Sequence, residues 1–232
     1  MKEIYFVRHG QTHNNTLHIK QGAEIDSVLN KNGKNQAKIT GKYLKKYRIK
    51  DRNFDCIITT PMKRGIETAE IIAKEIGFEK PIEILEELND IKRGKISGLR
   101  KRSQDRKKID QEVEKLKKKI GDPINFFYEF DIMKYLDEKF NIGSEPLENL
   151  HKRVKKIVDF IENSKFKKFI IITHGIMIMN ILKYMFNINY HPHVYFGNYK
   201  YGNNCWLSYV QYNRGKYKLI TPPDTEHLVL KL

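Results

Sequence analysis

The sequence predicts an α/β fold, a three-layer sandwich in which helices flank both faces of a mainly parallel central sheet. Short runs of apolar and β-branched residues alternate along the chain with segments whose apolar residues recur every three or four positions. The strand-like runs are apolar at nearly every position, which is typical of parallel strands buried on both faces. Because 232 residues can bury a substantial core, we expect a single domain spanning residues 1–232, with a basic and aromatic insertion at about 92–142.

Two strand–helix pairs are expected in the first third of the chain. The run EIYFV at residues 3–7 predicts a short buried strand, and a helical pattern follows from about 34 to 47. The run FDCIITT predicts the second strand. It ends at Thr60 and Pro61, a capping residue followed by proline, which predicts that the next helix starts there and runs to Gly77.

The rest of the chain continues this alternation around the insertion. Residues 81–88, PIEILEEL, predict a third strand that runs into an acidic loop. The lysine- and arginine-rich residues 92–119 predict a loop and an exposed helix, and the aromatic residues of 124–136 are candidates for a lid. A helix is expected from about 145 to 163. It precedes the uniformly apolar strand KFIIIT, a hydrophobic helix IMIMNILKYMF, and a hairpin formed by CWLSYVQY and YKLIT.

The composition narrows the class of protein without identifying a partner. The net charge of +16 is compatible with binding to nucleic acid, to an anionic membrane surface or to an anionic small substrate. It also fits a general lysine bias of the coding sequence, because acidic residues are mixed among the lysines. No run reaches membrane-spanning length and no secretion signal precedes the first strand, so we expect a cytoplasmic protein that does not contact membranes. No nucleic-acid-binding motif is present. Cys56 and Cys205 lie in strand-like stretches and are expected to be buried free thiols.

Polar residues typical of phosphate chemistry follow each of the predicted parallel strands. Arg8 and His9 end the first strand, and Arg64 lies just after the second. Asp90 follows the third, and His174 follows the fourth. Because the carboxyl ends of parallel strands meet at one edge of a sheet, we expect these side chains to gather there. Each residue alone is more often an ordinary turn or surface residue, and the coincidence at four strand ends is what favours a site.

These residue types suit a phosphoryl group. Guanidinium groups match phosphate oxygens with paired charged hydrogen bonds, and a helix N-terminus beside Arg64 adds backbone donors. A glycine after each histidine, Gly10 and Gly175, leaves room for backbone to approach an anion. A neutral imidazole can attack phosphorus, and a nearby carboxylic acid can protonate the leaving oxygen.

Several motifs resemble the histidine phosphatase superfamily, which includes the cofactor-dependent phosphoglycerate mutases. FVRHGQTHNN is similar to the superfamily's Arg-His-Gly signature, TTPMKRGIETA to its arginine segment, LNDIKRGKISGL to its acidic loop, and THG to its second His-Gly. QGAEIDSVLNKNGKNQA, GSEPLENLHKRV, NNCWLSYV and HLVL match further segments. The resemblance covers nearly the whole chain outside about 100–142 and implies a phosphoglycerate mutase-like fold.

The resemblance also implies roles for the residues at the sheet edge. His9 would be the nucleophile that forms a phosphohistidine. Arg8, Arg64 and a protonated His174 would hold the phosphoryl oxygens, and Asp90 would be the proton donor. No metal and no other cofactor is implied.

Some positions depart from the superfamily's pattern or extend the expected site. Many members have Glu where this chain has Asp90, so Glu87 is kept as the alternative acid. Asn15 and Gly175 are expected to contact substrate. Ser97 stands where Glu is common, and the usual Gly-Glu-Ser appears as Gly-Ser-Glu-Pro at residues 143–146.

These departures, with the absence of the proline-rich loop and paired arginines of glycolytic mutases, favour a phosphomonoesterase of the histidine acid phosphatase type that acts on a small phosphorylated metabolite. A 2,3-bisphosphoglycerate-dependent phosphoglycerate mutase, a protein phosphatase and a non-catalytic polyanion-binding protein remain alternatives. If the basic residues after the acid overhang the pocket, they favour a substrate with a second phosphate or carboxylate; otherwise they form a solvated loop. Those residues are Lys92, Arg93, Lys95, Arg100, Lys101 and Arg102.

Overall fold

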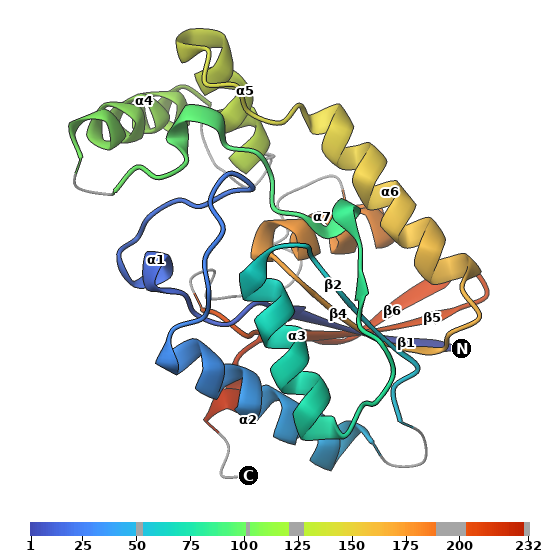
Figure 1. Cartoon of the computed structure of the whole chain (residues 1–232). Coiled ribbons are helices and arrows are strands. Elements are labelled where there is room, and N and C mark those ends of the chain that lie inside the picture. Colours follow the sequence, from blue (N-terminus) through green and yellow to red (C-terminus); the bar gives the residue numbers. More distant parts are fainter. Residues whose placement is uncertain (50–52, 101–102, 121–127, 189–202, 230–232) are drawn as a thin grey trace.

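A computed structural model describes residues 1–49, 53–100, 103–120, 128–188 and 203–229, and it contains a six-stranded sheet (Figure 1). The strand order is β3-β2-β4-β1-β5-β6. Strands β1, β2, β3 and β4 are parallel, whereas β5 is antiparallel to β1 and β6 is antiparallel to β5. The mainly parallel sheet is therefore confirmed. The strands are β1 (Lys2–Arg8), β2 (Cys56–Thr59), β3 (Glu83–Ile84), β4 (Lys168–Thr173), β5 (Leu207–Asn213) and β6 (Lys216–Asp224).

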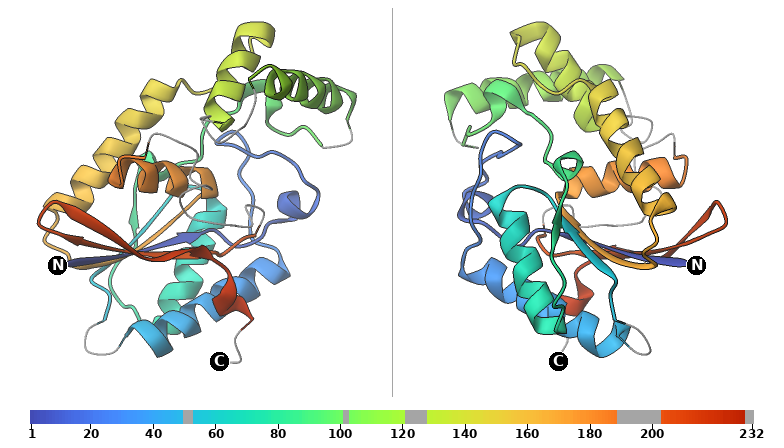
Figure 2. Two further views of the ribbon diagram at one scale, coloured as in Figure 1. Left: turned by 180° about the vertical axis from the view of Figure 1, so that it is seen from behind. Right: turned by 45° about the vertical axis from the view of Figure 1, so that its right-hand side comes forward.

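Helices cover both faces of this sheet, which confirms the three-layer arrangement. Helices α2 and α3 lie on one face, and α6 and α7 lie on the other (Figures 1 and 2). Helices α4 and α5 lie beyond the second helical layer. The helices are α1 (His13–Thr16), α2 (Lys31–Arg48), α3 (Lys63–Ile76), α4 (Gln104–Ile120), α5 (Tyr128–Phe140), α6 (Leu147–Asn163) and α7 (Gly175–Met185), with short 3-10 turns at η1 (Glu86–Leu88), η2 (Gly94–Ile96) and η4 (Glu226–Leu228).

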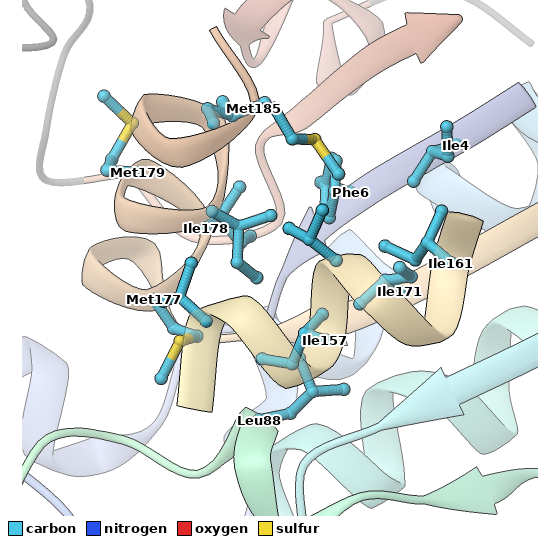
Figure 3. Packing of buried hydrophobic residues seen from close by; sticks show 14 of the residues in the cluster. Ile4, Phe6, Leu88, Ile157, Ile161, Ile171, Met177, Ile178, Met179 and Met185 are labelled. Atoms are coloured by element: carbon cyan, nitrogen blue, oxygen red, sulfur yellow. The ribbon is translucent and has the colours of Figure 1, made fainter. Parts of the chain in front are cut away.

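The sheet is apolar on both faces because successive side chains of each strand point to opposite layers. In β4, Phe169 and Ile171 pack in the cluster under α6 and α7, whereas Ile170 and Ile172 pack in the cluster under α2 and α3. Figure 3 shows the first cluster, in which Ile171 lies among side chains from α6 and α7. Burying a side chain of this size stabilises the fold by roughly 1.5–3 kcal/mol. The two cores therefore hold the strand ends in fixed positions.

The predicted third strand is much shorter than expected. Only Glu83–Ile84 pairs with β2, and a last ladder hydrogen bond runs from the Leu85 N–H to the Thr59 carbonyl at 3.0 Å. The chain then tightens into the 3-10 turn η1, which places Leu88 in the core with no exposed surface. This turn ends the pairing and brings the acidic loop to the carboxyl edge of the sheet.

The insertion forms a helical pair with a small core of its own. Ile96, Met133, Leu136 and Ile142 are buried together between α4 and α5. Helix α4 confirms the helix expected within residues 92–119. Residues 121–127, which include part of the expected aromatic lid, and the basic residues 101–102 lie outside the described residues.

Two further sequence predictions concern single features of the chain. Cys56 and Cys205 are buried free thiols, as expected. In the described ranges, no helix combines the length and the apolar character needed to cross a bilayer.

Candidate active site

The structure brings the five predicted residues together at the carboxyl edge of the parallel strands. The rings of His9 and His174, at the ends of the neighbouring strands β1 and β4, have their centres 5.2 Å apart. The Oδ2 atom of Asp90 lies 3.2 Å from the Nη2 atom of Arg64 and 3.5 Å from the Nδ1 atom of His174. Arg8 directly precedes His9, and its side chain runs past the start of α7.

The backbone fixes which nitrogen of His9 is free to react. The Nδ1 atom lies 2.8 Å from the carbonyl oxygen of Gly10. Because a carbonyl oxygen only accepts, Nδ1 must carry the proton, and the Nε2 atom of the neutral ring keeps its lone pair. His9 is 3% exposed. Burial, followed by the charge of Arg64, holds the pKa of His9 well below its usual value, so the ring is in the form that can attack phosphorus.

A polar network holds the loop that carries His9. The side-chain amide of Asn204 donates to the carbonyl oxygens of His9 and Gly10 at 3.1 and 3.3 Å, and to the Oδ1 atom of Asn15 at 3.2 Å. The same Asn15 oxygen accepts the Thr12 N–H as part of a capping box. The structure thus gives Asn15 a part in shaping the loop, and its predicted contact with substrate stays a prediction.

The glycine after His9 is explained by packing. A Cβ atom on Gly10 would lie 2.7 Å from the carbonyl oxygen of Gly33 in the first turn of α2. At Gly175, a Cβ atom would lie 3.5 Å from the Cδ and Nε atoms of Arg8, which is ordinary contact. A side chain is thus excluded at position 10 by the backbone of α2, a different reason from the expected approach of an anion. Gly175 lies beside the Arg8 side chain.

Arg64 is fully buried and tied to the loops around the site. Its Nη1 atom donates to the Ile25 carbonyl at 2.9 Å, and its Nη2 atom donates to the Gly22 carbonyl at 3.1 Å and to Asp90. Burial lowers the pKa of Arg64, and the Asp90 carboxylate acts in the opposite direction. These bonds fix the plane of the guanidinium group.

Two arginine nitrogens at the site still lack an acceptor among the described residues. They are the buried Nε atoms of Arg8 and Arg64. Arg8 is otherwise held by the bond from its Nη1 atom to the Asn203 carbonyl at 2.9 Å. An unpaired buried donor costs roughly 1–3 kcal/mol. Donors of this kind suit an anionic ligand that supplies the missing oxygens.

The surroundings of His174 differ from what the resemblance implies. Burial, followed by the charges of Arg64 and Arg8, lowers the pKa of His174 well below its usual value. Burial and the arginine charges both disfavour a protonated ring in the free protein, and the protonated His174 that the resemblance implies stays a prediction. A phosphoryl dianion beside the ring would raise that pKa again.

Thr60 has a role that the sequence analysis did not assign. It was predicted to cap the next helix, but α3 begins at Lys63 with Met62 in the cap position. The Oγ1 atom of Thr60 instead lies 3.1 Å from the Nε2 atom of His174. The helix therefore starts later than predicted, and the Thr60 hydroxyl contacts the site. Asn204 was also missed, although it stands in the matched segment NNCWLSYV.

The geometry separates the two candidate acids. The carboxylate of Glu87 pairs with Lys156 of α6 at 3.3 Å. Asp90 is directed at Arg64 and His174 and its side chain is 12% exposed. The arrangement therefore favours Asp90. Among the described residues, no group of three or more His, Cys, Asp or Glu side chains could hold a metal ion.

Comparison with known proteins gives one family. The sequence profile of the histidine phosphatase superfamily (branch 1) matches residues 4–225. The 2,3-bisphosphoglycerate-dependent phosphoglycerate mutase of Buchnera aphidicola subsp. Cinara cedri is 29% identical over 201 residues, which cover 81% of this chain and 85% of the mutase.

Solved structures share the fold at lower identity. Phosphoglycerate mutase from Bacillus anthracis aligns with a TM-score of 0.74 and 21% identity over 98% of this chain and 95% of its own. Phosphoserine phosphatase from Entamoeba histolytica, in complex with 3-phosphoglyceric acid, aligns with a TM-score of 0.66 and 22% identity over 99% of this chain and 100% of its own. The fold is thus found in both phosphatases and mutases.

Proposed function

The chain belongs to the histidine phosphatase superfamily, and we propose that it is a phosphomonoesterase that hydrolyses a small phosphorylated metabolite through a phosphohistidine on His9. Members of the superfamily are phosphatases or mutases, so the chain is an enzyme of phosphoryl transfer. One observation carries the proposal. The lone pair of His9 Nε2 is set free by the Nδ1 bond to Gly10, at an edge where buried arginine donors lack acceptors.

In the first step, His9 Nε2 attacks phosphorus and the bond from phosphorus to the ester oxygen breaks. The leaving oxygen takes a proton from Asp90, and the product alcohol departs. Arg8 and Arg64 donate to the equatorial oxygens, whose charge they stabilise in the transition state. The phosphoryl group is then bonded to His9 Nε2.

In the second step, water attacks the phosphohistidine. The Asp90 carboxylate accepts a proton from that water, and inorganic phosphate leaves with His9 neutral again. His174 lies between Asp90 and Thr60, where it can donate to a phosphoryl oxygen once the dianion has raised its pKa. Each group is thus returned to its starting state.

A phosphoglycerate mutase is the second candidate, and the Buchnera relative favours it. A mutase needs the phosphohistidine to survive until a second acceptor binds, whereas a phosphatase needs water to reach it. The differences at Ser97 and at residues 143–146 support hydrolysis. Relatives act on phosphoglycerate or phosphoserine by name, and a substrate of this small, anionic kind is part of our proposal.

The test is phosphate release from an aryl phosphate, with chelator present, by wild type, His9→Ala and Asp90→Asn. We expect turnover by wild type, none by His9→Ala, and a loss of roughly 100-fold or more by Asp90→Asn. His13→Ala, which removes an exposed histidine from α1, is the matched control and keeps full activity. Hydrolysis that survives in His9→Ala contradicts the proposal. If wild type releases no phosphate but interconverts phosphoglycerates when primed with 2,3-bisphosphoglycerate, the mutase reading is correct.

A further inference from the structure

Besides the pair of Glu87 with Lys156, another ion pair contacts the loop that carries Asp90. Arg153 of α6 and Glu145 form two parallel hydrogen bonds, from Nε to Oε1 at 2.9 Å and from Nη2 to Oε2 at 2.7 Å. The Glu145 side chain is 9% exposed and that of Arg153 is 20% exposed. This bidentate geometry fixes the guanidinium plane.

The remaining Nη1 atom of Arg153 reaches the backbone just before Asp90. It donates to the carbonyl oxygens of Glu87 and Asn89, each at 2.8 Å. The carbonyl between them, that of Leu88, accepts from the Thr173 hydroxyl at 2.5 Å. All three carbonyls that precede Asp90 are therefore anchored, two by α6 and one by the end of β4.

Glu145 holds the other side of the same loop. Its backbone N–H donates to the Lys92 carbonyl at 3.0 Å, and its Oε2 atom accepts from the Lys92 N–H at 3.4 Å. The loop from Glu87 to Lys92 is thus fixed on both sides of Asp90 by one partly buried pair. The Oδ1 atom of Asp90 accepts a hydrogen bond from the Ile91 N–H at 2.9 Å. The direction of the Asp90 carboxyl group therefore depends on the path of this backbone.

We propose that Arg153 and Glu145 are positioning residues that aim the carboxyl group of Asp90 at the leaving oxygen of the substrate. The inference rests on the proposed function, because it assumes that Asp90 donates the proton. The charge of Arg153 also contributes to the lowered pKa of His174, in keeping with a place close to the site.

The proposal predicts a change that a merely structural residue would not produce. A misplaced acid slows the expulsion of a basic alkoxide or phenolate far more than that of a weakly basic one, which leaves without a proton. The dependence of kcat/KM on leaving-group basicity therefore reports the position of Asp90. Since kcat/KM covers only the steps up to formation of the phosphohistidine, the later activation of water does not enter.

The experiment measures kcat/KM for a series of substituted phenyl phosphates that spans weakly to strongly basic phenolates. The variants are Arg153→Lys, Arg153→Met and Glu145→Gln, with Asp90→Asn as the reference for a missing acid. Lys152→Gln is the matched control, because its pair with Glu148 lies on the same helix at 2.7 Å but is exposed. Circular dichroism melting confirms that each variant is folded.

We expect kcat/KM to fall only slightly with leaving-group basicity in wild type and Lys152→Gln, and to fall steeply in Asp90→Asn. The Arg153 and Glu145 variants should lose about 10-fold or more on the most basic leaving group and less than about 3-fold on the least basic. Arg153→Lys should be steeper than wild type, because lysine keeps the charge without the forked geometry.

Two other results have separate meanings. If the Arg153 variants lose activity equally on every substrate, the pair is only structural and the inference is overturned while the proposed function stands. If wild type is already as steep as Asp90→Asn, Asp90 is not the acid, and the role of Asp90 in the proposed function fails together with the inference.

Discussion

Acidification should destabilise this protein through His227, a buried histidine that takes no part in the proposed reaction. His227 in η4 is 3% exposed, and its Nε2 atom lies 3.0 Å from the hydroxyl of Thr40 in α2. Burial lowers the pKa of His227 from 6.5 to about 4. We predict that replacing it with glutamine, which can still bond to Thr40, removes part of the protein's loss of stability in acid.

The size of the effect follows from proton linkage. The unfolded chain binds the proton with a pKa near 6.5 and the folded chain only near 4, so this contribution to stability is complete above pH 6.5, decreases as the pH falls from 6.5 to 4, and is absent below pH 4. Between pH 7 and pH 5 this amounts to about 2 kcal/mol in the free energy of unfolding. The full difference of 2.5 pKa units corresponds to about 3 kcal/mol below pH 4.

The assay is urea unfolding of wild type, His227→Gln and His13→Gln at pH 7 and pH 5, followed by circular dichroism. His9 and His174 also resist protonation, but they contribute equally to all three proteins and cancel in the comparison. Wild type and the exposed-residue control His13→Gln should lose about 2 kcal/mol more than His227→Gln between the two pH values. Equal losses in all three proteins would refute the assignment of a buried, neutral His227.

Three further predictions concern the site and its support. Because the pKa of His9 is lowered, kcat/KM for an aryl phosphate should stay constant as the pH falls through 6.5 and decline only in more acid solution; a midpoint at 6.5 would contradict this. Thr60→Val should reduce kcat/KM about 5-fold in steady-state kinetics, since one hydrogen bond to His174 is worth about 1 kcal/mol, and Thr60→Ser should restore it. Gly33→Ala should lower the free energy of unfolding by about 1–3 kcal/mol in urea titrations, because its Cβ would lie 2.1 Å from the Gln11 carbonyl; a neutral result would mean that the α2 contact is loose.

The sheet could be predicted because its strands are encoded locally. A run such as KFIIIT is short, β-branched and apolar at almost every position, which is typical of a strand buried on both faces. The rule that ligands bind at the carboxyl edge of a parallel sheet then predicts that Arg8, His9 and His174 lie together. Both steps use only the neighbours of each residue in sequence.

Other features could not be predicted because they depend on contacts between distant segments. Thr60 looks like a helix cap in sequence, but its hydroxyl bonds to a ring 114 residues away. In the sequence, nothing distinguishes Arg153 from the other cations of its helix. Its contact with the backbone of Glu87 arises only because α6 packs against η1. Lys156 of the same helix pairs with Glu87, and this contact, which favours Asp90 as the acid, is likewise set by the packing of α6.

The two ends of the insertion meet, so the length of the segment between them can vary without moving the edge of the sheet. The Lys95 N–H donates to the Ile142 carbonyl at 2.8 Å, and the Glu145 N–H donates to the Lys92 carbonyl, so the chain leaves and returns at one place. Doubling the length of a loop between fixed ends costs only about 0.6 kcal/mol in closure entropy. A shorter or longer segment can therefore replace the helices between these ends without a change in the backbone at the carboxyl edge of the sheet.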